Sequence, residues 1–124
     1  MQCPKCRAAL EIVIFDDVKI DRCTGCYGLW FDRGEDTRLR KSPGAAAIDI
    51  GDPKLAKPFN EMTRVDCPRC RTRMVRMVYA PQPHIWYESC ATCGGVWFDA
   101  GEFRDSLHVS LWNVIQDWFT PTRK

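Results

Sequence analysis

The sequence predicts a small α+β fold built from two similar modules, each a β-hairpin between cysteine turns followed by a helix. Three observations support this prediction. One pattern occurs twice, as CTGCYGLWFDRGE from Cys23 to Glu35 and as CATCGGVWFDAGE from Cys90 to Glu102. A CxxC turn with proline after its first cysteine precedes each copy. The segments between the paired turns are rich in β-branched residues, which is typical of strands.

The eight cysteines all fall in four CxxC turns. Sixteen residues separate the first two turns and nineteen separate the last two, and both gaps suit paired zinc knuckles. A tetrahedral site needs four soft ligands, and each turn supplies two thiolates. The sequence therefore predicts two structural Zn²⁺ ions per chain, which leaves no cysteine for a disulfide or a catalytic thiol; the predicted ligands are Cys3, Cys6, Cys23, Cys26, Cys67, Cys70, Cys90 and Cys93.

The hairpin of the first module follows Cys6. Residues 10–15 (LEIVIF) form the first predicted strand, Asp16 and Asp17 mark a turn, and residues 18–22 (VKIDR) return toward the second cysteine turn. Apolar and charged residues alternate along the return strand, as expected when one face is solvated. The second module repeats this plan with strands at 71–79 and 85–89.

A helix is expected after each repeat of the long pattern. Asp32 and Asp99 each stand three residues before a glutamate, Glu35 or Glu102, in the arrangement of a capping box. The first helix should cover residues 35–41 and stop before the Ser-Pro-Gly sequence that follows.

The combined pattern CPxC, hairpin, CxxCxGxWFDxGE resembles the TFIIB-type zinc-ribbon domain (zf-TFIIB), a family named for a transcription factor zinc finger. The resemblance covers roughly residues 1–40 and 65–105. It implies two tandem zinc ribbons and a setting related to transcription or translation. We expect Trp30 and Trp97 in the repeated pattern to be packing residues beside the metal rather than a ligand platform.

The repeats divide the chain into four parts: ribbon 1 at 1–41, a linker at 42–62, ribbon 2 at 63–105, and a helix at 106–119 that extends from ribbon 2. The linker contains several prolines and a run of alanines. Its scattered apolar residues leave open the alternative that it docks on a module; they are Ile48, Ile50, Leu55 and Phe59.

Size and charge limit the possible functions. Chains of about forty residues seldom fold without a metal or a crosslink, so we expect at least the first module to unfold without zinc. The net charge of +2 counts cysteines as neutral. Two zinc ions held by eight thiolates would bring it to about −2, which weakens any argument for nucleic-acid binding from overall charge.

The sequence also indicates a compartment. We expect no signal peptide, because no charged region and apolar run are readable before Cys3, and no apolar run approaches the length of a membrane span. Thiolates used as metal ligands fit a reducing compartment, so the cytoplasm is the expected location.

Residues 63–80 carry five arginines and one acidic residue. Arg69 and Arg71 lie close enough to a cysteine turn to offset the charge of the zinc site. Arg73 and Arg76 lie further along the predicted strand. They are therefore candidates for contacting phosphate or an acidic partner.

Apolar residues recur at helical spacing beyond Glu102 and predict a long amphipathic helix. Its face could pack within the chain, self-associate or bind a protein partner. Basic residues on it are sparse, so a membrane-surface role is not expected. The candidate partner-binding residues are Leu111, Trp112, Ile115, Trp118 and Phe119.

These features favour a zinc-binding interaction module over an enzyme. His84 and His108 are the only histidines, and no nucleophile, base and acid arrangement stands out. A protein partner is the first expectation and nucleic-acid binding through residues 71–76 is an alternative. A second alternative is a redox or metal-handling protein, since four thiolates accept iron as well as zinc.

Overall fold

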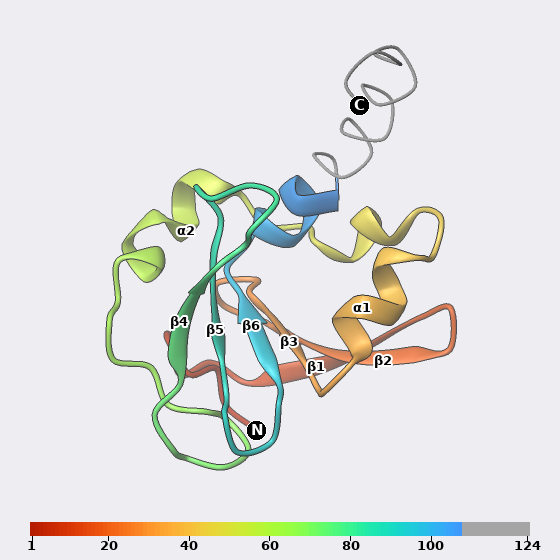
Figure 1. The fold of residues 1–124 in the computed structure, drawn as a ribbon. Helices are drawn as coiled ribbons and strands as arrows, with labels where there is room; N and C mark the ends of the chain where they lie inside the picture. Colours follow the sequence, from red (N-terminus) through yellow and green to blue (C-terminus); the bar gives the residue numbers. More distant parts are fainter. Residues whose placement is uncertain (108–124) are drawn as a thin grey trace.

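A computed structural model describes residues 1–107 of the chain, and its strands form one antiparallel sheet in the order β1-β2-β3-β6-β5-β4 (Figure 1). The fold is a small α+β structure. The strands are β1 (Leu10–Phe15), β2 (Val18–Cys23), β3 (Leu29–Phe31), β4 (Val75–Val78), β5 (Trp86–Ser89) and β6 (Val96–Phe98). The helices are α1 (Glu35–Arg40), the 3₁₀ helix η1 (Ala45–Ile48) and α2 (Pro53–Asn60), and residues 102–107 are also helical.

The two repeats meet in the middle of this sheet. Strands β3 and β6 pair antiparallel, with Trp30 opposite Trp97 and the flanking pairs Leu29–Phe98 and Phe31–Val96. Each repeat contributes three strands in the same order from edge to centre. The Trp30–Trp97 pair therefore marks an approximate two-fold axis between the repeats.

Both faces of the central strands are covered. On one face, Phe31, Phe98 and Phe103 form an aromatic cluster with ring centroids 4.8–5.9 Å apart. On the other face, Trp30 and Trp97 pack among the cysteines. Side chains of a strand alternate between the two faces of the sheet, and both faces are covered here. Every residue of β3 and β6 is therefore buried.

The segment predicted as a linker folds and docks on the sheet. It forms η1 and α2, and its Ala45 and Ile48 belong to the aromatic core. Asp52 accepts a hydrogen bond from the backbone N–H of Lys54 (2.9 Å) and so caps α2. The docked alternative is thus the one that the structure supports, although Leu55 of α2 stays exposed.

The predicted capping aspartates have a different role. Helix α1 begins after Gly34, which is the N-cap residue and has a left-handed backbone (φ 82°). No side chain accepts a hydrogen bond from the first turn of this helix. One half of the expected capping box is present, since Glu35 Oε1 accepts from the backbone N–H of Asp32 (2.8 Å). The carboxylate of Asp32 instead accepts from Trp30 Nε1 (3.1 Å).

The helical turn of the second repeat is capped from outside that repeat. Asp49, which follows η1, accepts from the backbone N–H groups of Gly101 (2.7 Å) and Arg104 (2.9 Å). The side chain of Arg104 in turn donates to the Asp49 carbonyl (2.7 Å). The segment between the repeats, predicted as a linker, is therefore hydrogen-bonded directly to the end of the second repeat.

The other predicted elements are either shorter in the structure or lie outside residues 1–107. The first expected strand of the second repeat is shorter, since β4 covers only Val75–Val78. The predicted C-terminal partner-binding residues, from Leu111 to Phe119, lie outside the described residues. Within residues 1–107, no helix is long and apolar enough to cross a membrane.

Candidate metal centres and the contacts between the repeats

The eight cysteines form two groups of four. Cys3, Cys6, Cys23 and Cys26 make one group, and Cys67, Cys70, Cys90 and Cys93 make the other; within each group all the sulfur atoms lie within 4.8 Å of one another. The first cysteine of each CxxC turn is buried and the second is partly exposed. In each site, two of the four cysteines are therefore partly accessible to solvent.

Backbone amides point at the buried sulfurs. Cys3 Sγ accepts from the N–H groups of Lys5 and Cys6, both at 3.3 Å. Cys67 Sγ accepts in the same way from Arg69 (3.4 Å) and Cys70 (3.3 Å). Hydrogen bonds to the charged form of a group stabilise that form, so these turns are preset to hold thiolates.

Without a cation the four thiols of a site cannot all ionise. The hydrogen bond with Cys23 raises the pKa of Cys3 to about 12, while hydrogen bonds from Cys26 and Cys3 lower the pKa of Cys23. Protons are therefore shared unevenly among sulfurs that crowd together. A divalent cation with a preference for soft ligands removes this conflict, and a four-thiolate set fits Zn²⁺.

Comparison with known protein families decides the identity of these sites. The family described as transcription factor zinc-finger matches the chain twice, over residues 2–41 and 66–108. The chain belongs to the transcription factor zinc-finger family. Its two four-cysteine groups are two zinc sites, one in each zinc-finger repeat. Neither the curated proteins nor the solved structures gave a match.

Each zinc-finger repeat leaves space for the tryptophan of the other. A Cβ atom added to Gly28 would lie 2.2 Å from Cζ2 of Trp97, and one added to Gly95 would lie 2.3 Å from Cζ2 of Trp30. Both indole rings are fully buried beside the cysteines. Gly28 and Gly95, which occupy equivalent positions in the two repeats, are therefore needed for contact between the repeats.

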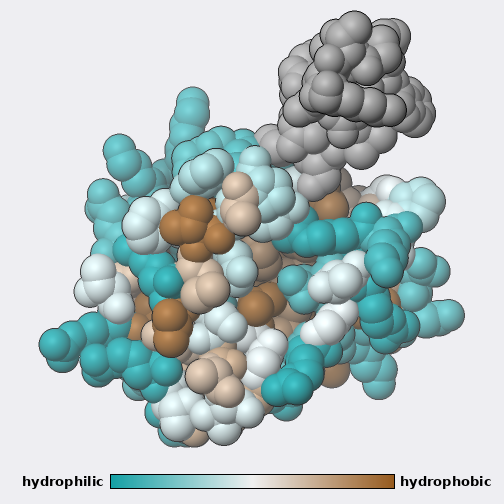
Figure 2. Space-filling model, in the orientation of Figure 1, coloured by the Kyte–Doolittle hydropathy of each residue, from teal (hydrophilic) through white to brown (hydrophobic). Residues whose placement is uncertain are grey.

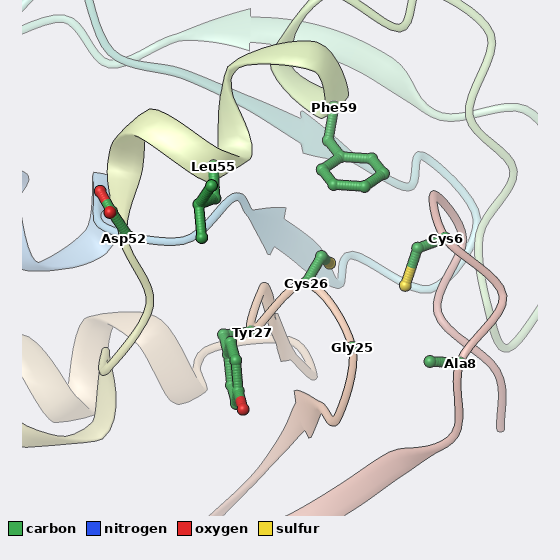
Figure 3. A pocket seen from close by; sticks show the side chains of 8 residues that line it. All are labelled: Cys6, Ala8, Gly25, Cys26, Tyr27, Asp52, Leu55 and Phe59. Carbon is green, nitrogen blue, oxygen red and sulfur yellow. The ribbon is translucent and has the colours of Figure 1, made fainter.

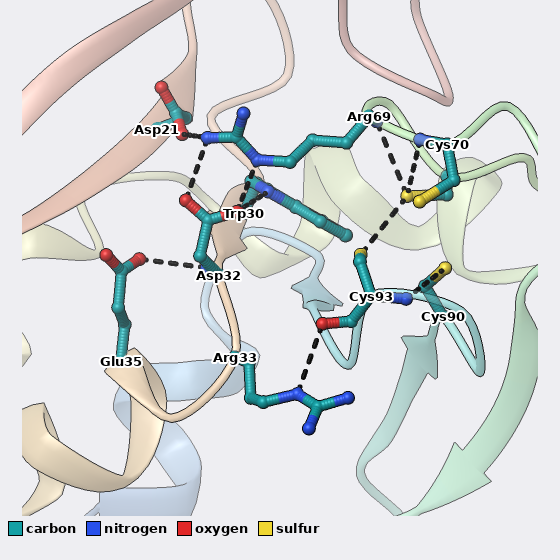
Figure 4. A network of polar contacts seen from close by, with 10 residues as sticks. Asp21, Trp30, Asp32, Arg33, Glu35, Arg69, Cys70, Cys90 and Cys93 are labelled. Atoms are coloured by element: carbon teal, nitrogen blue, oxygen red, sulfur yellow. Dashed lines mark hydrogen bonds and ion pairs between the residues drawn. The ribbon is translucent and has the colours of Figure 1, made fainter.

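A salt bridge from each repeat's first cysteine turn reaches the other repeat. Arg69 forms a two-pronged ion pair with Asp32, which includes Nη2–Oδ2 at 2.8 Å, and it also approaches Asp21 (4.0 Å) (Figure 4). The same figure shows Arg33 donating to the carbonyl of Cys93 (3.3 Å). Arg69 was expected near the zinc charge; its carboxylate partner in the first repeat was not predicted.

The equivalent salt bridge, from the first cysteine turn of the first repeat to the second repeat, is buried. Lys5 Nζ contacts Asp99 (2.8 Å) and Glu88 (3.2 Å) and donates to the carbonyl of Phe59 (2.9 Å). The Lys5 side chain is 0% exposed, whereas that of Arg69 is 45% exposed. A buried charge needs such partners, because removing it from water is costly. Sequence reasoning missed Lys5, although it stands at the same position of CPKC as Arg69 does in CPRC.

Glu102 is a buried carboxyl beside this cluster. Burial, with a smaller contribution from the charge of Asp99, raises its pKa to about 8. Its Oε2 has no hydrogen-bond partner among residues 1–107. Burial also raises the pKa of Glu88, and the charge of Lys5 opposes that shift. The cluster thus holds more carboxyl groups than its single lysine can neutralise.

The two arginines predicted to bind phosphate or an acidic partner are not equivalent. Arg76 donates to the carbonyl of Asn60, and its guanidinium lies 4.3 Å from the ring centroid of Trp86. Arg73 is exposed and lies two residues before β4 begins at Val75. The structure therefore does not bring the two together as one free basic surface.

Two depressions lie next to the zinc sites. An apolar hollow of about 360 Å³ is bounded by Leu55 and Phe59 of α2 on one side and by Tyr27 and the cysteine turns of the first site on the other (Figure 3). A polar groove of about 770 Å³ separates the two CPxC turns and is lined by Arg7, Arg64, Arg69 and Arg71. These depressions are candidate binding surfaces.

Proposed function

We propose that the chain is a zinc-dependent protein-interaction module, without catalytic activity, in the transcription- or translation-related setting that the family description suggests. The observation that carries this proposal is the apolar hollow beside the first zinc site. Leu55 is 74% exposed and Tyr27 is 40% exposed at its rim. An apolar hollow with exposed apolar side chains at its rim suits an apolar side chain of a protein partner. On the face drawn in Figure 2, apolar side chains form only small patches among hydrophilic ones.

The zinc sites would act as a frame in this function. The first site fixes the two CxxC turns that form one wall of the hollow, while α2 forms the other. Loss of zinc would thus remove the binding surface together with the fold. The predicted C-terminal segment remains a second proposed contact for the partner or for self-association, and we place the protein in the cytoplasm.

The alternatives have less support. Nucleic-acid binding through Arg73 and Arg76 has less support, because Arg76 already donates to the carbonyl of Asn60 and packs on the ring of Trp86. The redox or metal-handling alternative rests on the ligand sets alone, since four thiolates bind iron as well as zinc. Bound iron, or loss of zinc under mild peroxide, would support that role.

The test is crosslinking in cells followed by reconstitution. Proteins captured by the zinc-loaded chain should be lost with Leu55→Glu and kept with Ile12→Glu, which alters an apolar residue of similar exposure on β1. The purified partner should then bind the wild type in calorimetry and bind Leu55→Glu at least about tenfold more weakly. Equal binding by both variants would disprove the role of the hollow.

A further inference from the structure

The groove between the two CPxC turns carries arginines that the fold itself does not use. Arg7, Arg64 and Arg71 line it and are exposed, and no carboxylate among residues 1–107 lies within ion-pair distance of them. Arg69, in contrast, is held by Asp32. The groove thus has three available guanidinium groups and one acidic residue, Asp66, in its lining.

Two of these arginines occupy equivalent, unfavourable backbone positions. Arg7 and Arg71 each follow the second cysteine of a CPxC turn, and their φ angles are 71° and 65°. In both turns the arginine N–H donates to the carbonyl of the first cysteine, at 3.1 Å and 2.9 Å. Glycine adopts this left-handed conformation with the least strain. Arginine at both positions therefore adds charge to the groove from both repeats at a cost in backbone strain.

The geometry points to an acidic peptide segment as the ligand: we propose that the groove binds aspartate or glutamate side chains of a partner chain through Arg7, Arg64 and Arg71. Guanidinium groups pair with carboxylates through two parallel hydrogen bonds. The remaining lining includes Met62, Pro4 and Pro68, which supply apolar contact for the peptide between its acidic residues.

A nucleic acid fits the groove less well. Among residues 1–107, no aromatic side chain lines it, so these residues offer bases no surface for stacking. Cys3 and Cys67, which belong to the two zinc sites, also border the groove. Each site with its four thiolates would carry a formal charge of about −2, which disfavours a long polyanion. A short acidic segment pairs with the arginines locally and avoids most of that repulsion.

This inference deepens the proposed protein-binding function, but it concerns a different surface from the hollow beside α2. The two are tested separately, because Leu55 does not line the groove. Exposed arginine–carboxylate pairs are individually weak, so an isolated peptide should bind with low affinity, and the binding should weaken as the salt concentration rises.

Fluorescence anisotropy of the zinc-loaded chain with a short, labelled, glutamate-rich peptide tests the inference. The variant Arg7→Gln, Arg71→Gln should bind about tenfold more weakly, since two charge-assisted pairs are lost. The control Arg38→Gln, Lys41→Gln removes the same charge from exposed positions around α1 and should bind within about twofold of the wild type. Glutamine keeps the side-chain length and adds no new charge.

Other outcomes overturn the inference. Equal weakening in both double variants would mean unspecific attraction, and no binding at low salt would mean no site. Tighter binding of a labelled oligothymidylate than of the peptide would assign the groove to nucleic acid. Should the groove variant misfold, amide chemical-shift changes in the wild-type chain decide: peptide-induced shifts around Arg7, Arg64 and Arg71 support the site, and shifts confined elsewhere refute it.

Discussion

Gly28 is a residue whose missing side chain determines how the repeats meet. An added Cβ would lie 2.2 Å from the buried ring of Trp97, which is closed in on all sides and cannot move away freely. Overpacking a rigid core typically costs about 1–3 kcal/mol, and we expect Gly28→Ala to cost about 3 kcal/mol. Urea unfolding of the zinc-loaded protein, followed by tryptophan fluorescence, measures this change.

Gly34 provides the matched control. Unlike Gly28, it adopts a left-handed backbone (φ 82°), and an added Cβ there would meet no atom within 4 Å. Gly34→Ala should therefore cost only the conformational strain, about 1 kcal/mol. If both substitutions lowered the free energy of unfolding equally, the close packing of Gly28 against Trp97 would not be the reason for that glycine.

Glu102 makes the stability depend on pH in a direction opposite to most carboxylates. Burial and the nearby Asp99 raise its pKa from 4.5 to about 8 in the folded protein. Between these two values the folded state holds a proton that the unfolded state has released. The free energy of unfolding contributed by this group is therefore present below pH 4.5 and is lost as the pH rises toward 8.

The variant Glu102→Gln mimics the protonated acid at every pH. At about pH 5 it should match the wild type, and at about pH 8 it should be more stable by roughly 1–3 kcal/mol. Comparing the two proteins at each pH cancels the pH dependence of zinc binding, which affects both equally. A difference between them that did not vary with pH would show that Glu102 keeps an ordinary pKa.

At the scale of elements, the helical turn after Gly101 depends on Asp49 from the segment between the repeats. Asp49 is buried and accepts from two backbone N–H groups of that turn. Asp49→Ala would leave both donors without partners, and we expect a loss of about 2 kcal/mol in the free energy of unfolding.

Asp52→Ala is the control for this prediction, because Asp52 also caps a helix but is exposed. Water can replace its carboxylate, so the loss should be below about 1 kcal/mol. Denaturant titration of both variants checks the order. A larger loss for Asp52 would mean that α2, rather than the contact through Asp49, limits the stability.

The elements that sequence patterns predicted are those whose signals are local. The hairpin of β1 and β2 follows from alternating residues around Asp16 and Asp17, and its observed bounds agree closely with that pattern. Strands β3 and β6 have three residues each and are buried on both faces, so they show no alternation. The cap at Gly101 comes from Asp49, 52 residues earlier, and no local motif reveals it.

For the whole molecule, the zinc ligands could be predicted from local sequence signals, whereas the contacts between the repeats could not. The spacing of the CxxC turns indicates which four cysteines share a site, because a hairpin brings two turns together. The bridges made by Lys5 and Arg69 join residues 94 and 37 positions apart. Such pairings depend on how β3 meets β6, which the sequence of either repeat alone does not determine.

This arrangement predicts that the two zinc sites fold as one unit. Trp30 and Trp97 pack with cysteines of both sites in a single buried cluster, and one sheet runs through both repeats. The apparent binding energy of structural zinc, about 10–16 kcal/mol, is comparable with the whole stability of a small domain. Loss of one site should therefore unfold both repeats.

Replacing one ligand in either site tests this prediction. Cys6→Ser and Cys70→Ser should each reduce bound zinc from two ions to fewer than one. Each should also remove most of the far-ultraviolet signal of the sheet, because the repeat that keeps its four ligands would lose its partner. Its tryptophan would then have no glycine of the other repeat to pack against, and its aspartate would have no ion pair. Elemental analysis and circular dichroism measure both quantities. Independent modules would give a different result: one zinc ion retained, with about half of the sheet signal, in each variant. That result would show that the contacts through Gly28, Lys5 and Arg69 only align two repeats that are already stable.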